Sequence, residues 1–503
     1  MPCGTQDTWA YHRQVKRSEY DIAQAKFLSR GKISAMALRP TLSKESHSLP
    51  EAYRTVGVPQ GNGWRAFLAF LGPGYLVSVG YMDPGNWATD LAGGSQFGFA
   101  LLWVILASNL MAILLQTLCA RLGLVTGKDL AQSCRDYYKR PAAIALWVLC
   151  EIAIIACDLA EVIGSAVALE LLFGIPLLWG VLITGFDVLI LLGLMRFGFR
   201  KLEAIVITLV ATVSGCFVLE MALAKPPMPA VLHGMLVPSL PGPEALVIAL
   251  GILGATVMPH NLYLHSSIVQ TRAFERTKEG LRAALRFATW DTVIALGLAF
   301  FVNAAILVLA AAVFHTSGTT VDDLKDAFVL LKPLLGGAAA TAFAVALLAS
   351  GQSSTITGTL AGQIVMEGFL NIRIKPWLRR LITRLLAIIP ALVMISVSGG
   401  KDTVGLLVFS QVVLSMQLSF AVVPLLMFTS DRKRMGEHTN PLWLQIVGYT
   451  VGTIIVSLNL YYLASKWPLW TGIGAALAAG FAAWVIWVYR PTQVRVAQDT
   501  MSA

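Results

Sequence analysis

The tetrapeptide Asp83-Pro84-Gly85-Asn86 interrupts an apolar stretch, residues 67–94, that is long enough to span a bilayer. A carboxylate near the middle of a membrane costs roughly 2.5–3.5 kcal/mol on insertion scales. Pro84 removes a helical hydrogen bond, and Gly85 lets the backbone leave the helical conformation. Because lipid cannot satisfy broken backbone, the break must face protein or a water-filled cavity. A charge at such a break indicates a binding site.

The composition is that of an all-α polytopic membrane protein. The 503 residues are 56% hydrophobic and 13% charged, with a mean hydropathy of +0.69. A soluble protein carries about 25% charged residues. The sequence predicts about twelve transmembrane helices, and their apolar stretches lie near 67–94, 97–121, 142–170, 177–195, 202–223, 244–269, 286–314, 338–370, 380–398, 404–429, 442–464 and 469–489.

Lysine and arginine predict the orientation of these helices. Of the 38 Lys and Arg residues, most lie in the two tails and in the connections after the second, fourth, sixth, eighth and tenth stretches. Positive residues mark the cytoplasmic side, so both termini are expected in the cytoplasm and the chain in the plasma (inner) membrane. The opposite side carries few positive charges: Lys225, Lys325, Lys332, Lys401 and Lys466.

A second break occurs in the sixth stretch, at Met258-Pro259-His260-Asn261. Five predicted helices separate the start of one break from the start of the other. Since an odd number of helices reverses orientation, the first and sixth helices are expected to be broken at corresponding positions of two inverted repeats. Paired broken helices point to the midplane site of a transporter. The alternative for each proline alone is a simple kink.

This arrangement predicts the domain organisation. A polar, basic and disordered cytoplasmic tail is expected over residues 1–65, without a cleavable signal peptide. The first five-helix repeat is assigned to 66–223 and the second, inverted repeat to 244–429. Two additional helices follow in 442–489, and residues 490–503 form a cytoplasmic tail.

The side chains at the two breaks favour a cation. Unwound backbone offers carbonyl oxygens, to which Asp83 adds a carboxylate and Asn86 an amide oxygen. The Met258 thioether is soft, so it favours Mn²⁺, Fe²⁺ or Cd²⁺ over Mg²⁺ or Ca²⁺, which prefer oxygen ligands. Ordinary core packing is the alternative for a methionine considered alone.

The two motifs resemble the hallmark motifs of the Nramp divalent-metal transporters, and Gly351–Leu360 with Glu367-Gly368 resembles the family's eighth-helix signature. The similarity runs from Gly72 to Thr429 and is greatest to the bacterial, proton-coupled manganese importers. It implies a LeuT-type 5+5 inverted-repeat fold and alternating access. By position, it implies these metal ligands: Asp83, Asn86, the Ala255 carbonyl and the Met258 sulfur, joined in some conformations by the Gly80 carbonyl and Gln411. Residue 80 is glycine where the family often has alanine, which preserves a carbonyl.

Three carboxylates lie on one face of the predicted helix 142–170. Glu151, Asp158 and Glu161 are spaced i, i+7 and i+10, and they must line a cavity or pair with cations such as Arg384 or Arg380. One interpretation is a structural salt-bridge network. The other is a proton relay, and the Nramp resemblance implies a pathway through Asp83, His260, these acids and Arg384. Cys157 lies where relatives can carry a hydroxyl residue.

Further polar side chains occur within predicted helices. Asn109 and Gln116 share a face, and Asn303 lies in the seventh helix. Gating networks and helix–helix hydrogen bonds are both open for them. His265 is predicted to be a buried structural histidine or a gating contact rather than a metal ligand.

The sequence therefore predicts a proton-coupled importer of Mn²⁺, with Fe²⁺ and Cd²⁺ as further ions, that has no enzymatic activity. Its partners are the metal ions, protons and the lipid bilayer, with no cofactor besides the transported ions. The alternatives are a sodium-coupled amino-acid symporter of the same fold, whose carboxylate substrate Asp83 would repel, and a magnesium-transporting relative. A metalloenzyme and ATP-driven transport are disfavoured, since neither HExxH nor GxxxxGK[ST] is present. A channel is disfavoured because two broken helices suit alternating access better than a fixed filter. Nucleic-acid binding is disfavoured because the basic residues are scattered among short loops.

Overall fold

The computed structural model describes residues 47–59, 63–186, 198–321, 323–372, 374–398 and 403–466. Among these residues, eight helical segments are long and apolar enough to cross a membrane. The helices are α2 (Trp64–Phe70), α3 (Pro73–Ser78), α4 (Pro84–Phe97), α5 (Leu102–Thr126), α6 (Leu130–Tyr137), α7 (Arg140–Phe173), α8 (Leu177–Thr184), α10 (Phe199–Ala224), α11 (Met228–Leu236), α12 (Pro243–Thr256), α13 (Pro259–Ile268), α14 (Lys278–Ala310), α15 (Leu324–Leu335), α16 (Gly337–Leu370), α17 (Pro376–Ser398), α18 (Thr403–Ser430), α19 (Arg432–Met435) and α20 (Leu442–Lys466).

Eleven of the twelve predicted helices fall wholly or partly within the described residues. The fourth is described only as far as residue 186, where it contains α8. The predicted twelfth helix, 469–489, and the tail 490–503 lie outside the described residues. The ninth, α17, spans 23 residues, and its described residues include the apolar stretch Leu381–Val393.

Both predicted breaks are present. The first transmembrane helix consists of α3, a 3₁₀ turn at Val79–Met82 and α4, with Asp83 in an extended conformation between them. The sixth consists of α12 and α13, which Val257 and Met258 separate. In each case a proline occupies the first position of the second half-helix, where its missing N–H leaves no helical hydrogen bond unmade.

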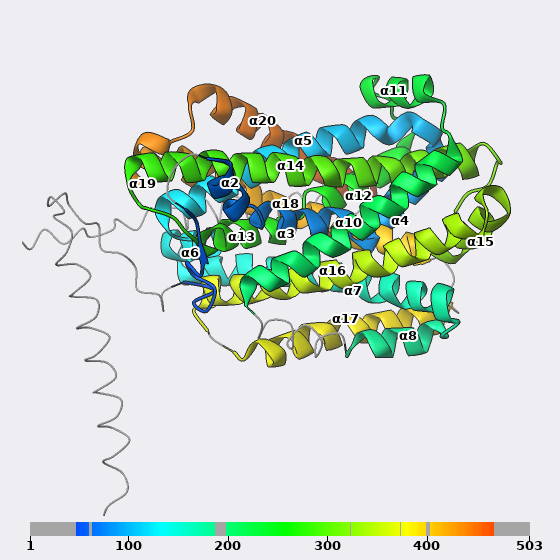
Figure 1. The fold of residues 1–503 in the computed structure, drawn as a ribbon, viewed down its shortest axis with the longest axis horizontal. Helices are drawn as coiled ribbons and strands as arrows, with labels where there is room; N and C mark the ends of the chain where they lie inside the picture. Colours follow the sequence, from blue (N-terminus) through cyan, green and yellow to red (C-terminus); the bar gives the residue numbers. More distant parts are fainter. Residues whose placement is uncertain are drawn as a thin grey trace, which may run out of the picture. The chain divides into compact units, whose positions relative to one another are not determined.

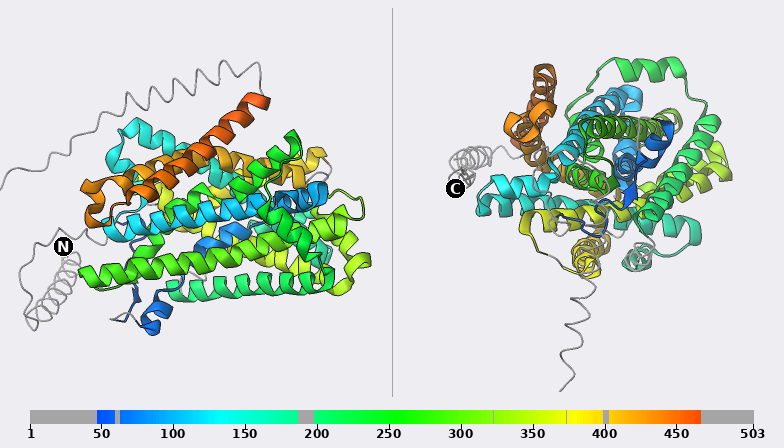
Figure 2. Two further views of the ribbon diagram at one scale, coloured as in Figure 1. Left: turned by 90° about the horizontal axis from the view of Figure 1, so that it is seen from above. Right: turned by 60° about the vertical axis from the view of Figure 1, so that its left-hand side comes forward.

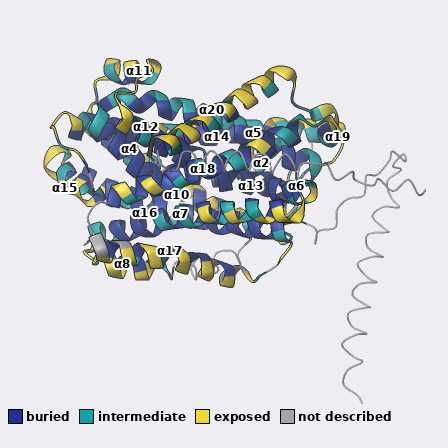
Figure 3. Ribbon diagram, turned by 180° about the vertical axis from the view of Figure 1, so that it is seen from behind, coloured by how far each residue is buried: buried dark blue, intermediate teal, exposed yellow. Residues whose placement is uncertain are grey.

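The two broken helices lie inside the bundle. Figure 1 shows α3, α4, α12 and α13 in its middle, and α12 packs on α4 while α13 packs on α3. The views in Figure 2 agree with this placement. Exposed residues gather on the outer helices α8, α17 and α20 (Figure 3), and many of them are large and apolar. Such a belt of exposed apolar side chains is what a lipid-facing surface requires.

A segment before the first helix is ordered. Residues Val56–Gly57 form strand β1, which pairs in parallel with β2 (Arg272–Ala273), and Leu49 is buried in the main core. The Ser48 hydroxyl donates to Asp129, the N-cap of α6. Composition predicts disorder for the whole tail, and residues 47–59 differ because backbone pairing with β2 and burial of Leu49 stabilise them. For residues 1–46, which lie outside the described part, disorder stays a prediction.

Candidate metal site

Asp83 caps the second half of the first transmembrane helix. Its Oδ1 accepts hydrogen bonds from the backbone N–H of Asn86 at 2.8 Å and from the Asn86 side-chain amide at 2.7 Å. The carboxylate is fully buried. An N-cap position places it at the positive end of the α4 dipole, which stabilises a negative charge that lipid would not tolerate.

Oxygens from both breaks converge on the Asn86 amide group. Besides Asp83 Oδ1, its Nδ2 donates to the Gly80 carbonyl at 3.2 Å and to the Ala255 carbonyl at 3.1 Å. Asn303 Nδ2 of α14 donates to Asn86 Oδ1 at 3.1 Å. Three acceptor oxygens, one of them on a carboxylate, thus surround a single point between the two broken helices, which is an arrangement that suits a cation.

Met258 lies beside this point. It is the N-cap residue of α13, is fully buried and makes no side-chain capping bond. A Cβ atom built on Gly80 would lie 3.2 Å from its Sδ, so the sulfur is close to the backbone of the first break. Gln411 of α18 lies against Gly85, and its Nε2 donates to Ser410 Oγ at 3.1 Å. The predicted ligands from three helices therefore meet in one region.

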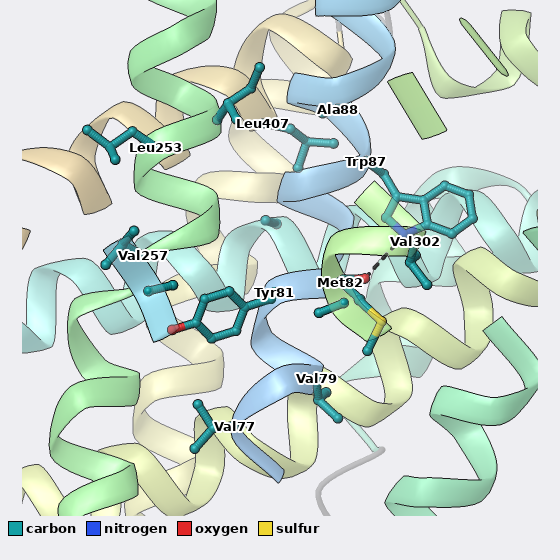
Figure 4. Packing of buried hydrophobic residues seen from close by; sticks show 14 of the residues in the cluster. Val77, Val79, Tyr81, Met82, Trp87, Ala88, Leu253, Val257, Val302 and Leu407 are labelled. Carbon is teal, nitrogen blue, oxygen red and sulfur yellow. Dashed lines mark hydrogen bonds between the residues drawn. The ribbon is translucent and has the colours of Figure 1, made fainter. Parts of the chain in front are cut away.

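The unwound backbone of the first break is satisfied by side chains. The Met82 carbonyl accepts a hydrogen bond from Trp87 Nε1 at 3.2 Å, drawn as a dashed line in Figure 4, and another from the Ser350 hydroxyl. Trp87 packs in turn against Phe217 and Phe343. These contacts keep the non-helical segment buried in protein, which is the condition for breaking a helix in a membrane.

The remaining polar residues divide into two groups. Gln116 Nε2 donates to the Tyr81 hydroxyl at 2.8 Å, and Gln116 Oε1 lies 3.0 Å from His265 Nδ1. His265 thus contacts Gln116 in a network between helices, and its role stays a prediction. Asn303 contacts the site directly through Asn86, whereas Asn109 is simply buried on α5.

The carboxylates of α7 form a network that begins at the site. Cys157 Sγ lies 3.8 Å from Asp83 Oδ2 and 3.8 Å from Glu161 Oε1. Glu161 Oε2 is 3.4 Å from Arg384 Nη1 and accepts from Thr355 Oγ1 at 3.1 Å. Asp158 Oδ1 lies 4.0 Å from the same arginine nitrogen. A buried arginine holds two buried acids here, and the thiol lies between them and the site.

Glu151 lies farther out and pairs with an arginine that the sequence did not single out. Its Oε1 is 2.9 Å from Arg379 Nη2 and accepts from Trp147 Nε1 at 3.0 Å. The sequence suggested Arg380, whose side chain lies outside the described part. Spacing on an isolated helix does not distinguish neighbouring arginines, because helix rotation against α7 decides which one faces the acid.

His260 is buried on α13, two residues past Met258. Its Nδ1 has no hydrogen-bond partner in the described part of the chain. It lies in the first turn of α13, close to the second break.

A second ionic cluster holds the start of α3. Asp291 of α14 accepts hydrogen bonds from the backbone N–H groups of Gly72 at 3.2 Å and Gly74 at 2.6 Å. Arg272 Nη2 lies 2.7 Å from Glu203 Oε1 and donates to the Leu71 carbonyl at 2.8 Å. The motifs of the sequence did not predict this cluster, although Glu203 and Asp291 are acids within apolar segments and could have indicated it.

Among the described residues, no group of three or more His, Cys, Asp or Glu side chains is arranged to hold a metal. A metal at the two breaks would therefore be bound by one carboxylate, amide and carbonyl oxygens and a thioether. That donor set suits a transported ion better than a permanently held one, because thiolate and histidine cages bind far more tightly.

Two broken helices that pack on each other, with buried polar groups at both breaks, define a secondary transporter built from inverted repeats. The family model described as "Natural resistance-associated macrophage protein-like" matches residues 74–465. This chain belongs to that family, the Nramp transporters, which confirms the resemblance of its motifs.

Relatives and solved structures agree with this assignment. The chain is 61% identical over 428 residues to the divalent metal cation transporter MntH of Nostoc sp., covering 84% of this chain and 96% of the relative. It is 59% identical over 422 residues to MntH of Mesorhizobium japonicum, covering 83% and 93%.

A crystal structure of the manganese transporter of Eremococcus coleocola matches with a TM-score of 0.77 and 39% identity, covering 88% of this chain and 98% of the other. Mhp1, a nucleobase-cation-symport-1 family transporter, matches with a TM-score of 0.53 at 14% identity, covering 83% and 95%, and indicates the fold alone. The LeuT-type fold is confirmed.

Proposed function

We propose that this chain is a proton-coupled secondary transporter that imports Mn²⁺, with Fe²⁺ and Cd²⁺ as further substrates. The observation that carries the proposal is the convergence of Asp83 Oδ1 and the Gly80 and Ala255 carbonyls on one amide group beside the Met258 sulfur. A divalent ion in the place now taken by the Asn86 NH₂ group would attract the same three oxygens more strongly, because it carries a full positive charge.

The Met258 sulfur supports the choice of metal. A thioether adds little to the binding of Mg²⁺ and much more to that of softer ions, which argues against a magnesium transporter. Asp83 argues against a substrate that carries its own carboxylate. The names of the relatives, divalent metal cation transporters and a manganese transporter, point the same way.

Alternating access follows from burial at the breaks. Asp83 and Met258 are 0% exposed, and Asn86 is 1% exposed, so the site is closed to both sides. Entry and release require half-helices to move, and the two breaks are the hinges at which they can do so. We assign the Asp291 and Arg272 cluster to the cytoplasmic side, where it would hold α3 closed.

Proton coupling is assigned to the path from Asp83 to Glu161. A divalent ion at Asp83 favours the deprotonated carboxylate, so metal binding releases a proton. Cys157 lies within 3.8 Å of both carboxylates and can pass the proton toward Glu161, Arg384 and the outer pair Glu151–Arg379. His260 is a second proton acceptor next to the site.

The distribution of Lys and Arg supports an orientation with both termini in the cytoplasm and the chain in the plasma membrane. Import is then movement toward the side that carries Arg272 and Arg434.

The test is uptake of Mn²⁺ into proteoliposomes that contain a pH-sensitive dye. We expect the lumen to acidify when Mn²⁺ is added outside, and Glu161→Gln to reduce acidification per metal ion while metal binding persists. Metal entry without any proton movement would make the protein a uniporter, and no entry of Mn²⁺ at all would refute metal import.

A further inference from the structure

Asn261 is a fully buried side chain that has no role in the site described so far. It lies one turn into α13, and its Nδ2 donates to Met258 Sδ at 3.6 Å. Its Oδ1 has no hydrogen-bond partner in the described part of the chain. A buried amide oxygen without a donor costs about 1–3 kcal/mol. Because this oxygen accepts no hydrogen bond from the described residues and Asn261 contacts Met258, it is available to bind a cation at the proposed metal site.

Gly80 makes the room that Asn261 occupies. A Cβ atom built on Gly80 would overlap with Asn261 Nδ2 and would lie 3.2 Å from Met258 Sδ. Gly80 lies in the 3₁₀ turn Val79–Met82 and has no positive φ, so its backbone does not require glycine. What glycine provides at this position is space, and the Asn261 amide fills it.

The two asparagines of the site differ in how firmly they are held. Asn86 Oδ1 accepts a hydrogen bond from Asn303, so turning its amide breaks that bond. Turning the Asn261 amide breaks only a weak N–H···S contact, because its oxygen has no partner to lose. Rotation of a carboxamide by half a turn exchanges its donor nitrogen for its acceptor oxygen.

We propose that Asn261 is a specificity-determining ligand of the transported metal. Its carboxamide turns to present Oδ1 beside Met258 Sδ, in the space that Gly80 leaves open. The site then combines a soft sulfur with one further hard oxygen, which favours Mn²⁺ relative to the softer Cd²⁺. This inference rests on the proposed metal transport at Asp83 and Met258.

The test compares Mn²⁺ and Cd²⁺ uptake by the full-length protein in proteoliposomes. Asn261→Ala is expected to raise the KM for Mn²⁺ about tenfold, the low end of the range for groups that support a metal site. The KM for Cd²⁺ should rise less, so the ratio of the two constants shifts. Asn261→Asp, which keeps an oxygen, should retain the wild-type ratio.

Gly80→Ala provides an independent variant, because its Cβ displaces the amide and leaves Asn261 in the sequence. The atoms that it meets are side-chain tips, so folding is expected to survive. It should shift the Mn²⁺-to-Cd²⁺ ratio as Asn261→Ala does, and the double variant should show no additional shift. Gly297→Ala on α14, where nothing lies within 4 Å of the new Cβ, is the matched control.

An unchanged KM ratio in Asn261→Ala, with wild-type expression and thermal stability, overturns the inference and leaves metal transport intact. A shift in Asn261→Asp equal to that in Asn261→Ala would also overturn it, since the nitrogen would then be the important atom. If Asp83→Ala transports Mn²⁺ normally, the proposed function itself has failed, and this outcome is distinct from both.

Discussion

The two helix breaks occupy corresponding positions, yet they are built from different chemistry. At the first break, Asp83 caps α4 with its carboxylate, and Asn86 bonds to three oxygens. At the second, Met258 caps α13 with no side-chain capping bond, and its sulfur accepts a long contact of 3.6 Å from the Asn261 amide. One half of the site is hard and strongly hydrogen-bonded, and the other is soft and weakly bonded.

This difference suggests a division of labour. In the proposed transport, the hard half supplies the charge that attracts a divalent ion, and Cys157 connects it to Glu161 of α7. The soft half adds little electrostatic attraction but discriminates among ions, because a thioether sulfur binds the softer metals more strongly. In transporters with inverted repeats, paired breaks lie near the membrane midplane, and here the side chains at the two breaks differ.

The largest expected effect comes from removing the hard half. Asp83→Ala should reduce Mn²⁺ uptake by more than about hundredfold, beyond the range for supporting groups, because the only carboxylate at the breaks is lost. Initial rates of ⁵⁴Mn²⁺ uptake into proteoliposomes measure this, with protein-free liposomes as the baseline. Normal uptake by the variant would show that the carboxylate is not the centre of the site.

A pair of glycine substitutions compares how tightly each break packs on α18. A Cβ on Gly254 would overlap with the Gln411 backbone carbonyl, whereas one on Gly85 would meet only the Gln411 side chain. Gly254→Ala should therefore destabilise the protein by about 1–3 kcal/mol, as overpacking does. Gly85→Ala should cost less, because the end of a flexible side chain can move.

Thermal unfolding in detergent measures both variants, and Gly297→Ala again serves as the control. Equal loss of stability in the two variants would mean that α18 holds both breaks equally rigidly.

Removing the soft half should change selectivity more than rate. Met258→Ala is expected to reduce the preference for Mn²⁺ and Cd²⁺ over Ca²⁺ and Mg²⁺ by roughly tenfold, about 1.4 kcal/mol, because a ligand that only the softer ions use is lost. Competition of Ca²⁺ and Mg²⁺ with labelled Mn²⁺ measures this. Selectivity equal to that of the wild type would show that Met258 is an ordinary packed core residue and not a metal ligand.

The smallest effect is expected at the far edge of the acid network that continues from the hard half. Glu151 pairs with Arg379 at the outer end of the network. Glu151→Gln keeps the size and hydrogen-bonding groups of the side chain, so it should slow proton entry by no more than about fivefold, about 1 kcal/mol in the barrier. Internal acidification on addition of Mn²⁺ measures the change. A loss as large as that in Glu161→Gln would show that protons must pass Glu151.

Local chemistry made both breaks predictable. Proline, glycine and charge within apolar stretches are rare enough in a membrane that Asp83-Pro84-Gly85-Asn86 and Met258-Pro259-His260-Asn261 could be found without a structure. The spacing of Glu151, Asp158 and Glu161 likewise follows from helical periodicity alone. The partner Arg379 could not be found in this way, because it depends on how α17 is rotated against α7.

Three features of this protein can be predicted from its sequence alone: it spans a membrane, two of its helices are broken, and particular side chains lie at each break. These features depend on local backbone chemistry and on the cost of placing charge in lipid. Three other features depend on the packing of the helices: Asn86 bonds to oxygens of both breaks, Cys157 lies between Asp83 and Glu161, and Asn261 fills the space beside Gly80. Such contacts join residues from separate helices, and their geometry depends on how those helices pack.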